Sequence, residues 1–236
     1  MALYIIGDTH FSSDRDKPMD VFGGKWLGYD QKLMDSIGEC MKSDDDVLVI
    51  CGDFSWGMNL ADTLPDFRRL DSFPGKKILL KGNHDYWWET VAKMNRFFDD
   101  NGITTIEFLH NNFFEYNSKI LLCGTRGWMY DNSKPSSAED KVFKREVMRL
   151  RQSLEAASSY ADGREILCFL HYPPVCRDYE ISAFTDVMKE FNVKLCCYGH
   201  LHGESIRNAF TGMRGGIEYK LVSADAVDFV PVKLSE

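Results

Sequence analysis

Five short apolar runs along the chain each end in a small group of Gly, Asp, Asn or His residues. This repeated plan limits the possible folds more than any other feature of the sequence. The runs cover residues 4–7, 47–51, 78–80, 166–170 and 195–198. Apolar runs of this length, bounded by glycine or polar residues, are typical of strands buried on both faces. In open α/β sheets ligands bind beyond the carboxyl ends of the strands, so five such ends predict one shared site.

The order of the remaining elements predicts the architecture. Helical spacing of apolar residues alternates with the strand-like runs in the first hundred residues, which favours parallel strands with right-handed crossovers. Helices are expected at 29–41, 60–71, 87–99, 138–161 and 182–191, and strands at 4–7, 47–51, 76–81, 103–109, 112–116, 119–124, 165–170, 194–198, 217–223 and 227–234. About ten strands exceed what one twisted open sheet carries well, so we expect an α/β fold with two stacked sheets flanked by helices. The length of 236 residues predicts a single domain over residues 1–236.

Composition excludes several classes of protein. The formal net charge of -8 argues against bulk binding to nucleic acid, although bound cations can still attract a phosphate ligand. No apolar run approaches the length that spans a bilayer, and the first strand begins too early to leave room for a signal peptide. The seven cysteines form no CxxC pair and fall mostly inside strand-like runs, which predicts reduced, buried thiols and a cytoplasmic location.

The polar groups at the strand ends have the donor chemistry of a metal site. In chain order they are Asp8-x-His10, Gly52-Asp53, Gly82-Asn83-His84-Asp85, His171 and Gly199-His200-x-His202. Carboxylate, amide and imidazole donors suit manganese, iron or zinc. A lone histidine is more often a hydrogen-bonded polar residue, and a lone Gly-Asp is a common turn. However, five of the six histidines fall at these ends, with only His110 elsewhere, and the set predicts a metal site.

This ordered set of motifs, which spans residues 8–202, resembles that of the calcineurin-like metallophosphoesterases. The resemblance implies a four-layer α/β/β/α sandwich of two mixed sheets and a centre of two divalent or trivalent ions, most often manganese or iron, with zinc as a further option. By motif position, one ion would be held by Asp8, His10, Asp53 and His202. The other would be held by Asp53, Asn83, His171 and His200, so that Asp53 bridges the two ions.

The same resemblance implies a chemistry. Two cations about 3.5–4 Å apart can clamp phosphate oxygens and lower the pKa of a shared water, giving a bridging hydroxide that attacks phosphorus in line with the leaving group. Asp53 is catalytic through that bridge. His84, which lies in the motif but is not needed as a ligand, would act as general acid or stabilise the phosphoryl charge.

The sequence departs from the protein phosphatases of this superfamily, which carry Gly-Asp-x-x-Asp-Arg-Gly. Here the corresponding stretch is 52–57, Gly-Asp-Phe-Ser-Trp-Gly, without the second Asp or the Arg, so His84 has no assigned partner. A replacement phosphate ligand could be Arg126, which could equally be a surface residue in a turn. Aromatic residues beside the motifs could stack on a planar substrate group or form cleft walls, and Trp128 and Tyr172 are candidates for substrate binding.

The sequence therefore predicts a dinuclear-metal phosphohydrolase that acts on a small phosphorylated substrate. The lost Arg and the surrounding aromatic residues slightly favour a phosphodiester or nucleotide-like substrate. The alternatives are a phosphomonoesterase or protein phosphatase, and a non-catalytic metal-dependent scaffold protein. A nuclease for long DNA or RNA would need a basic track, which the net charge does not supply.

Overall fold

Two β-sheets form the centre of the molecule in the computed structural model, which describes residues 1–13, 17, 19–129 and 137–235. The five-stranded sheet has the order β11-β1-β2-β3-β4 and the six-stranded sheet the order β5-β6-β7-β8-β10-β9. The first consists of β1 (Leu3–Ile6), β2 (Val47–Ile50), β3 (Lys76–Leu79), β4 (Ile106–Phe108) and β11 (Val232–Ser235). The second consists of β5 (Phe113–Glu115), β6 (Ile120–Thr125), β7 (Glu165–Leu170), β8 (Leu195–Tyr198), β9 (Gly212–Arg214) and β10 (Ile217–Leu221).

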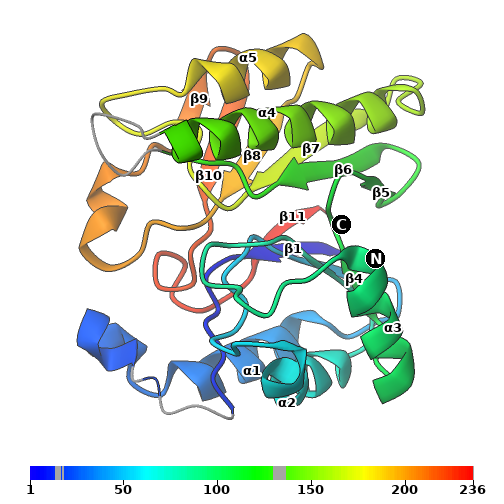
Figure 1. Cartoon of the computed structure of the whole chain (residues 1–236), viewed down its shortest axis with the longest axis vertical. Helices are drawn as coiled ribbons and strands as arrows, with labels where there is room; N and C mark the ends of the chain where they lie inside the picture. The colour runs from blue at the N-terminus through cyan, green and yellow to red at the C-terminus, as the bar shows by residue number, and fades with distance from the viewer. Residues whose placement is uncertain (14–16, 18, 130–136, 236) are drawn as a thin grey trace.

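Helices cover the outer face of each sheet, which gives the predicted four-layer α/β/β/α sandwich (Figure 1). The helices over the five-stranded sheet are α1 (Tyr29–Cys40), α2 (Leu60–Asp71) and α3 (Val91–Asn101). Those over the six-stranded sheet are α4 (Ser137–Ser158) and α5 (Ser182–Glu190). Among the described residues, three short 3-10 helices, η1 (Met19–Phe22), η2 (Gly24–Trp26) and η3 (Gly203–Asn208), lie in the connecting loops. No helix among the described residues is long and apolar enough to cross a membrane.

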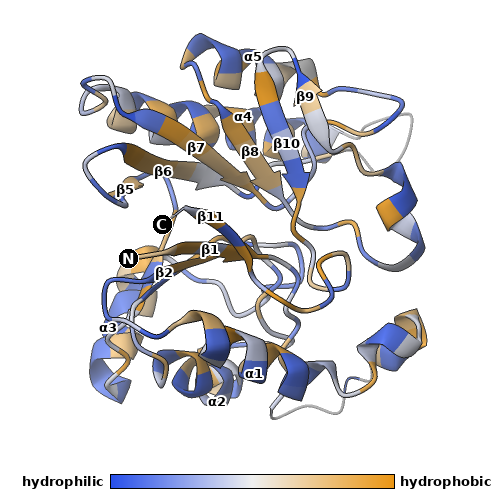
Figure 2. Cartoon of the chain, turned by 180° about the vertical axis from the view of Figure 1, so that it is seen from behind, coloured by the Kyte–Doolittle hydropathy of each residue, from blue (hydrophilic) through white to orange (hydrophobic). Residues whose placement is uncertain are grey.

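The apolar strand sequences are explained by burial on both faces. In β2, Val47 and Val49 belong to the core between the two sheets, whereas Leu48 and Ile50 pack with the residues of α1, α2 and α3. This alternation follows from the two-residue period of a strand. A third core lies between the six-stranded sheet and helices α4 and α5. Figure 2 shows the result, with apolar strands in the middle and polar helix surfaces outside.

Strand direction places the site. Strands β1 to β4 run parallel to one another, as do β6, β7, β8 and β10, while β5, β9 and β11 are antiparallel at or near the edges. The carboxyl ends of the two parallel groups meet at one side of the sandwich. A backbone hydrogen bond joins the two sheets at this side: the Gly7 N–H, after β1, donates to the Val222 carbonyl, after β10, at 2.7 Å.

Some predicted boundaries were wrong for local reasons. The helix expected from residue 87 begins at Val91, because Thr90 caps it by accepting a hydrogen bond from the Lys93 N–H. In the strand expected over 227–234, residues 227–229 form a turn and residues 230 and 231 are irregular, and only Val232–Ser235 pairs with β1. The short strand β9 and the 3-10 helices were not predicted. The helix expected at 138–161 is α4, which ends three residues earlier, at Ser158.

Candidate metal centre and active site

The predicted ligands lie in tight turns immediately after the strands. Asp8, His10, Asp53 and His200 have positive φ angles of 55°, 47°, 52° and 71°. Few residues other than glycine adopt this left-handed conformation, and those that do concentrate at functional sites. Four of the nine such residues among those described are predicted ligands, so the backbone strain is concentrated where the side chains converge.

Two glycines permit this close convergence. A Cβ atom on Gly82 would lie 2.1 Å from Asp53 Oδ1, and one on Gly199 would lie 2.6 Å from Asp8 Oδ2. Neither position has room for a side chain, since real Cβ atoms essentially never approach other atoms below 3.0 Å. The Gly-Asn-His-Asp and Gly-His-x-His motifs therefore need glycine so that the loops from one strand can touch the carboxylates of another.

One group of donors comes from both sheets. His171 Nε2 lies 2.6 Å from Asn83 Oδ1, and His200 Nδ1 lies 2.9 Å from the same oxygen and 3.2 Å from His171 Nε2. The other nitrogen of His171, Nδ1, lies 3.0 Å from the Cys51 carbonyl. A carbonyl can only accept a hydrogen bond, so this contact selects the tautomer of His171 that carries its proton on Nδ1. The lone pair of Nε2 is then directed at the cluster.

A second group lies beside the first. His10 is fully buried, and neither of its ring nitrogens has a hydrogen-bond partner among the described residues. His202 Nδ1 is likewise buried and without a partner, and the two rings are 5.6 Å apart. Asp8 is fully buried and accepts two contacts, of 3.0 and 2.8 Å, from the His200 N–H. Buried polar nitrogens without partners destabilise a fold unless a bound cation satisfies them, so this group fits a metal ion.

Asp53 lies between the two groups. Its Oδ2 atom is 3.7 Å from His10 Nε2 and 3.6 Å from His171 Nε2, while its Oδ1 accepts a 2.7 Å hydrogen bond from the His84 N–H. Asp8, Asp53 and His171 also form a buried cluster whose ligand atoms all lie within 4.8 Å of one another. A single carboxylate oxygen midway between two sets of imidazole donors is the arrangement expected of a bridging ligand.

Burial controls the titration of these groups. It lowers the pKa of His200 to about 4, with the neighbouring His202 and His84 adding to the effect, and lowers the pKa values of His10 and His171 well below the ordinary value. These rings are therefore neutral at pH 7 and can donate lone pairs to a metal. Burial also raises the pKa of Asp8 to about 7 and raises the pKa of Asp53 well above its ordinary value, and the neighbouring carboxylates add to both effects. Cations in the cluster would reverse this repulsion.

His84 faces the same cluster but has different surroundings. It is half-buried, with its ring 4.6 Å from Trp56 and 5.7 Å from His10. Its Nδ1 lies 3.4 Å from the Tyr86 hydroxyl, which supplies the neighbour that the sequence left unassigned. Trp56 also stacks on His10 at 4.7 Å, so one aromatic ring supports both histidines.

Asp85, the last residue of the same motif, organises the loops. Its carboxylate accepts hydrogen bonds from the Asp53 and Phe54 N–H groups at 2.9 Å each, from the Gly82 N–H at 2.7 Å and from Trp87 Nε1 at 3.0 Å. It therefore fixes the β2 and β3 loops to each other. The side chain is buried and fully engaged, so it is a positioning residue and points to no further ligand.

The three residues predicted to bind substrate lie together next to the cluster. Trp128 and Tyr172 line a pocket of about 380 Å³ with Asn83, Met129, Glu139 and His200. Their rings are 5.3 Å apart, and Tyr172 is 4.3 Å from the ring of His200. Arg126 packs against Trp128, with its guanidinium carbon 4.9 Å from the ring centre, and its side chain turns toward Glu146 on α4.

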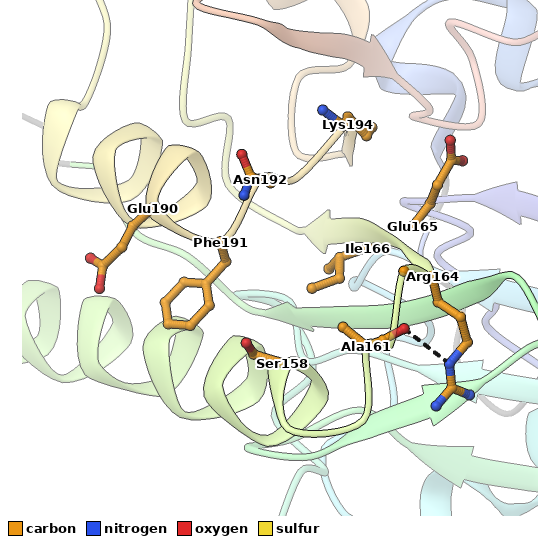
Figure 3. Close-up of a pocket in the computed structure, with 10 residues that line it drawn as sticks. Ser158, Ala161, Arg164, Glu165, Ile166, Glu190, Phe191, Asn192 and Lys194 are labelled. Carbon is orange, nitrogen blue, oxygen red and sulfur yellow. Dashed lines mark hydrogen bonds between the residues drawn. The ribbon is translucent and has the colours of Figure 1, made fainter.

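A larger hollow of about 580 Å³ lies at the other end of the six-stranded sheet (Figure 3). It opens where β7 and β8 begin, and its charged lining residues are Arg164, Glu165, Glu190 and Lys194. It contains none of the predicted site residues. The predicted site residues lie instead at the carboxyl ends of the strands, as expected for an α/β sheet.

Sequence reasoning missed Ser223 and Asp225, which follow β10. Asp225 is buried and accepts a 2.6 Å hydrogen bond from the Gly203 N–H, so it holds the loop that carries His202. Ser223 lies beside Asp8, where burial raises the pKa of that carboxyl and the neighbouring Ser223 opposes the rise. The rule that polar residues at strand ends form the site would have found Ser-Ala-Asp, which begins at the end of the strand expected over 217–223.

A buried group of aspartate, asparagine and histidine donors at the open edge of an α/β/β/α sandwich defines a metal-dependent phosphoesterase. Residues 1–204 match the family of calcineurin-like phosphoesterases, and the chain belongs to that family. It is accordingly a metal-dependent hydrolase of phosphoester bonds. No curated protein matches the chain.

Solved structures share the fold. A protein of unknown function from Aquifex aeolicus is 20% identical, with a TM-score of 0.52, and the alignment covers 98% of this chain and 95% of that one. Phosphopantetheinyl hydrolase from Mycobacterium tuberculosis is 17% identical, with a TM-score of 0.60, covering 94% and 88%. A protein from Thermus thermophilus is 13% identical, with a TM-score of 0.57, covering 99% and 97%. At these identities the likeness concerns the fold.

Proposed function

We propose that this chain holds two metal ions and hydrolyses a small phosphodiester or nucleotide-like substrate. The observation that carries the proposal is the position of Asp53 Oδ2, 3.7 Å from His10 Nε2 and 3.6 Å from His171 Nε2. Asp53 would bridge the ions. One ion would also take Asp8, His10 and His202, and the other Asn83, His171 and His200.

The donor set suits manganese, iron or zinc, since it mixes carboxylate, amide and neutral imidazole. When bound, such a pair of ions activates water as a nucleophile and offsets the charge on the phosphoryl oxygens. The protein's own part is to fix the donors before substrate arrives. The Cys51 carbonyl orients His171, the His200 N–H orients Asp8 and the His84 N–H orients Asp53, so little reorganisation accompanies the reaction.

His84 is the proposed proton donor to the leaving oxygen. It faces the cluster, yet in the assignment above it is not a ligand, and the Tyr86 hydroxyl near Nδ1 can hold the ring orientation. The pKa of His84 is lowered by burial and by the nearby His202 and Lys17 charges. A substrate phosphate would oppose these effects, because a negative charge beside the ring favours its protonated form.

The pocket at Trp128 and Tyr172 supports the proposed class of substrate. Its volume of about 380 Å³ suits one planar ring system beside the scissile phosphate, and its aromatic walls can stack on such a group. The segment Phe54-Ser55-Trp56 lacks the Arg that grips phosphate in protein phosphatases, which favours a diester with one fewer charge. All seven cysteines are free, in keeping with the reducing cytoplasm as the place of action.

The test compares bis-para-nitrophenyl phosphate with para-nitrophenyl phosphate in the presence of Mn²⁺. The proposal expects turnover of both, with the higher kcat/KM for the diester. A strong preference for the monoester would overturn the assignment to diesters while leaving the metal centre in place. The double variant His10→Ala and His171→Ala, which removes one proposed ligand from each ion, is the matched negative control.

A further inference from the structure

Three arginine side chains gather around one buried carboxylate beside the active site, and Lys81 lies in the loop next to them. Glu146, on α4, is fully buried and accepts a 2.7 Å hydrogen bond from Arg149 Nη1 and a 2.9 Å hydrogen bond from the Thr125 hydroxyl. Arg126 Nη2 lies 3.5 Å and Arg145 Nε lies 3.9 Å from the same carboxylate. We call Lys81, Arg126, Arg145, Arg149 and Glu146 the Glu146 cluster.

The charges of this cluster do not balance. Glu146 offsets one of the three guanidinium groups around it, in a chain whose formal net charge is -8. Lys81 is also close, since its pKa is lowered by burial and by the positive charge of Arg126. Arg126 is largely buried, and its Nε–H has no hydrogen-bond partner among the described residues. Partly buried cations that exceed their counter-charges repel one another, and a bound anion would relieve that repulsion.

The cluster adjoins the proposed metal centre on two sides. Lys81 is two residues before Asn83, so their Cα atoms are at most about 7 Å apart. The Arg126 carbonyl accepts hydrogen bonds from the His171 N–H at 3.0 Å and from the Tyr172 N–H at 2.9 Å. Arg126 also packs on Trp128, which lines the substrate pocket. None of the cluster's side chains lines that pocket, so the anionic group that reaches them would belong to a substrate that extends past Trp128.

We propose that the Glu146 cluster is a second anion subsite that binds another phosphate group of the same substrate. The inference rests on the proposed function, because it requires the scissile phosphate to occupy the metal centre. Arginine forks bind phosphate oxygens in pairs, and Glu146 holds the Arg126 and Arg149 guanidinium groups in place. The substrate class is then a nucleotide-like molecule with two separate phosphate groups, one cleaved and one held.

The test measures binding of adenosine 5′-phosphate and adenosine 3′,5′-bisphosphate to the Mn²⁺-loaded protein by titration calorimetry. The bisphosphate is expected to bind at least about tenfold more tightly, as one further charge-assisted contact predicts. Arg149→Ala should reduce that ratio to about threefold or less. Lys81→Ala, a second variant at a separate position, should reduce it as well. The control is Arg151→Ala on the same helix, because Arg151 bonds to Glu190 instead, and it should keep the wild-type ratio.

A wild-type ratio near one would overturn the subsite, as would an equal fall in Arg149→Ala and Arg151→Ala. Turnover of bis-para-nitrophenyl phosphate is measured in parallel. Its absence would contradict the proposed function, whereas turnover combined with a ratio near one would contradict the second subsite alone.

Discussion

The substitution Gly82→Ala tests whether the site depends on close packing of its loops. Gly82 is the third residue after β3, and its added methyl group would lie 2.1 Å from Asp53 Oδ1 and 2.2 Å from the Asp53 nitrogen. Both atoms belong to the residue proposed to bridge the metal ions. The surroundings cannot yield easily, because Asp85 ties the Gly82 and Asp53 N–H groups to a single buried carboxylate.

Relief of that overlap requires the two loops to separate by about 1 Å. A displacement of this size at a reacting centre lowers rates by about 100-fold, and forcing an extra methyl group into a packed interior destabilises a protein by about 1–3 kcal/mol. We therefore expect kcat/KM for bis-para-nitrophenyl phosphate with Mn²⁺ to fall about 100-fold. The free energy of unfolding, measured by urea denaturation, should fall by about 1–3 kcal/mol.

The matched control is Gly24→Ala, since a Cβ there meets no atom within 4 Å and the residue does not have a positive φ. It should keep wild-type activity and stability. If Gly82→Ala retained kcat/KM within about threefold of the wild type, the contact between the β3 loop and Asp53 would not control the geometry of the site.

Three further outcomes follow from the same structure. His84→Asn should lower kcat about 100-fold for an alkyl phosphoester, whose leaving oxygen needs a proton, but much less for a para-nitrophenyl ester, and equal losses on both would contradict the acid role. Burial raises the pKa of Asp8 to about 7, so protons compete with cations for the Asp8 carboxylate below that pH. Calorimetry should show that the affinity for Mn²⁺ falls by up to about tenfold for each pH unit below 7, and an affinity independent of pH would refute the competition. Trp128→Ala should raise KM for the diester about tenfold without changing metal content, whereas the exposed Tyr160→Ala should not, and an unchanged KM would remove Trp128 from the substrate site.

The sequence was most informative where burial and chemistry coincide. Strands such as β2 could be predicted because residues 47–50 are apolar on both faces, which only a strand between two layers requires. The convergence of Asp8, Asp53 and His171 could be predicted because parallel strands bring their carboxyl ends to one edge. Both features can be predicted from short stretches of sequence, because each depends on the pattern of apolar residues in a strand and the polar residues that follow it.

Features set by tertiary contacts could not be predicted. The Trp56 ring on His10 depends on how two loops pack, which local sequence does not encode. Glu146 looks like any charged residue of a long amphipathic helix, and its burial follows from the way α4 crosses β6.

The central claim is that Asp53 bridges two metal ions that this chain uses for phosphoester hydrolysis. The most direct test is elemental analysis of the purified protein, combined with hydrolysis of bis-para-nitrophenyl phosphate before chelation, after chelation and after Mn²⁺ is restored. We predict about two metal ions per chain, loss of both metal and turnover on chelation, and recovery of both with Mn²⁺. A protein that binds no metal even when Mn²⁺ is supplied, or that keeps full turnover after chelation, would contradict the account.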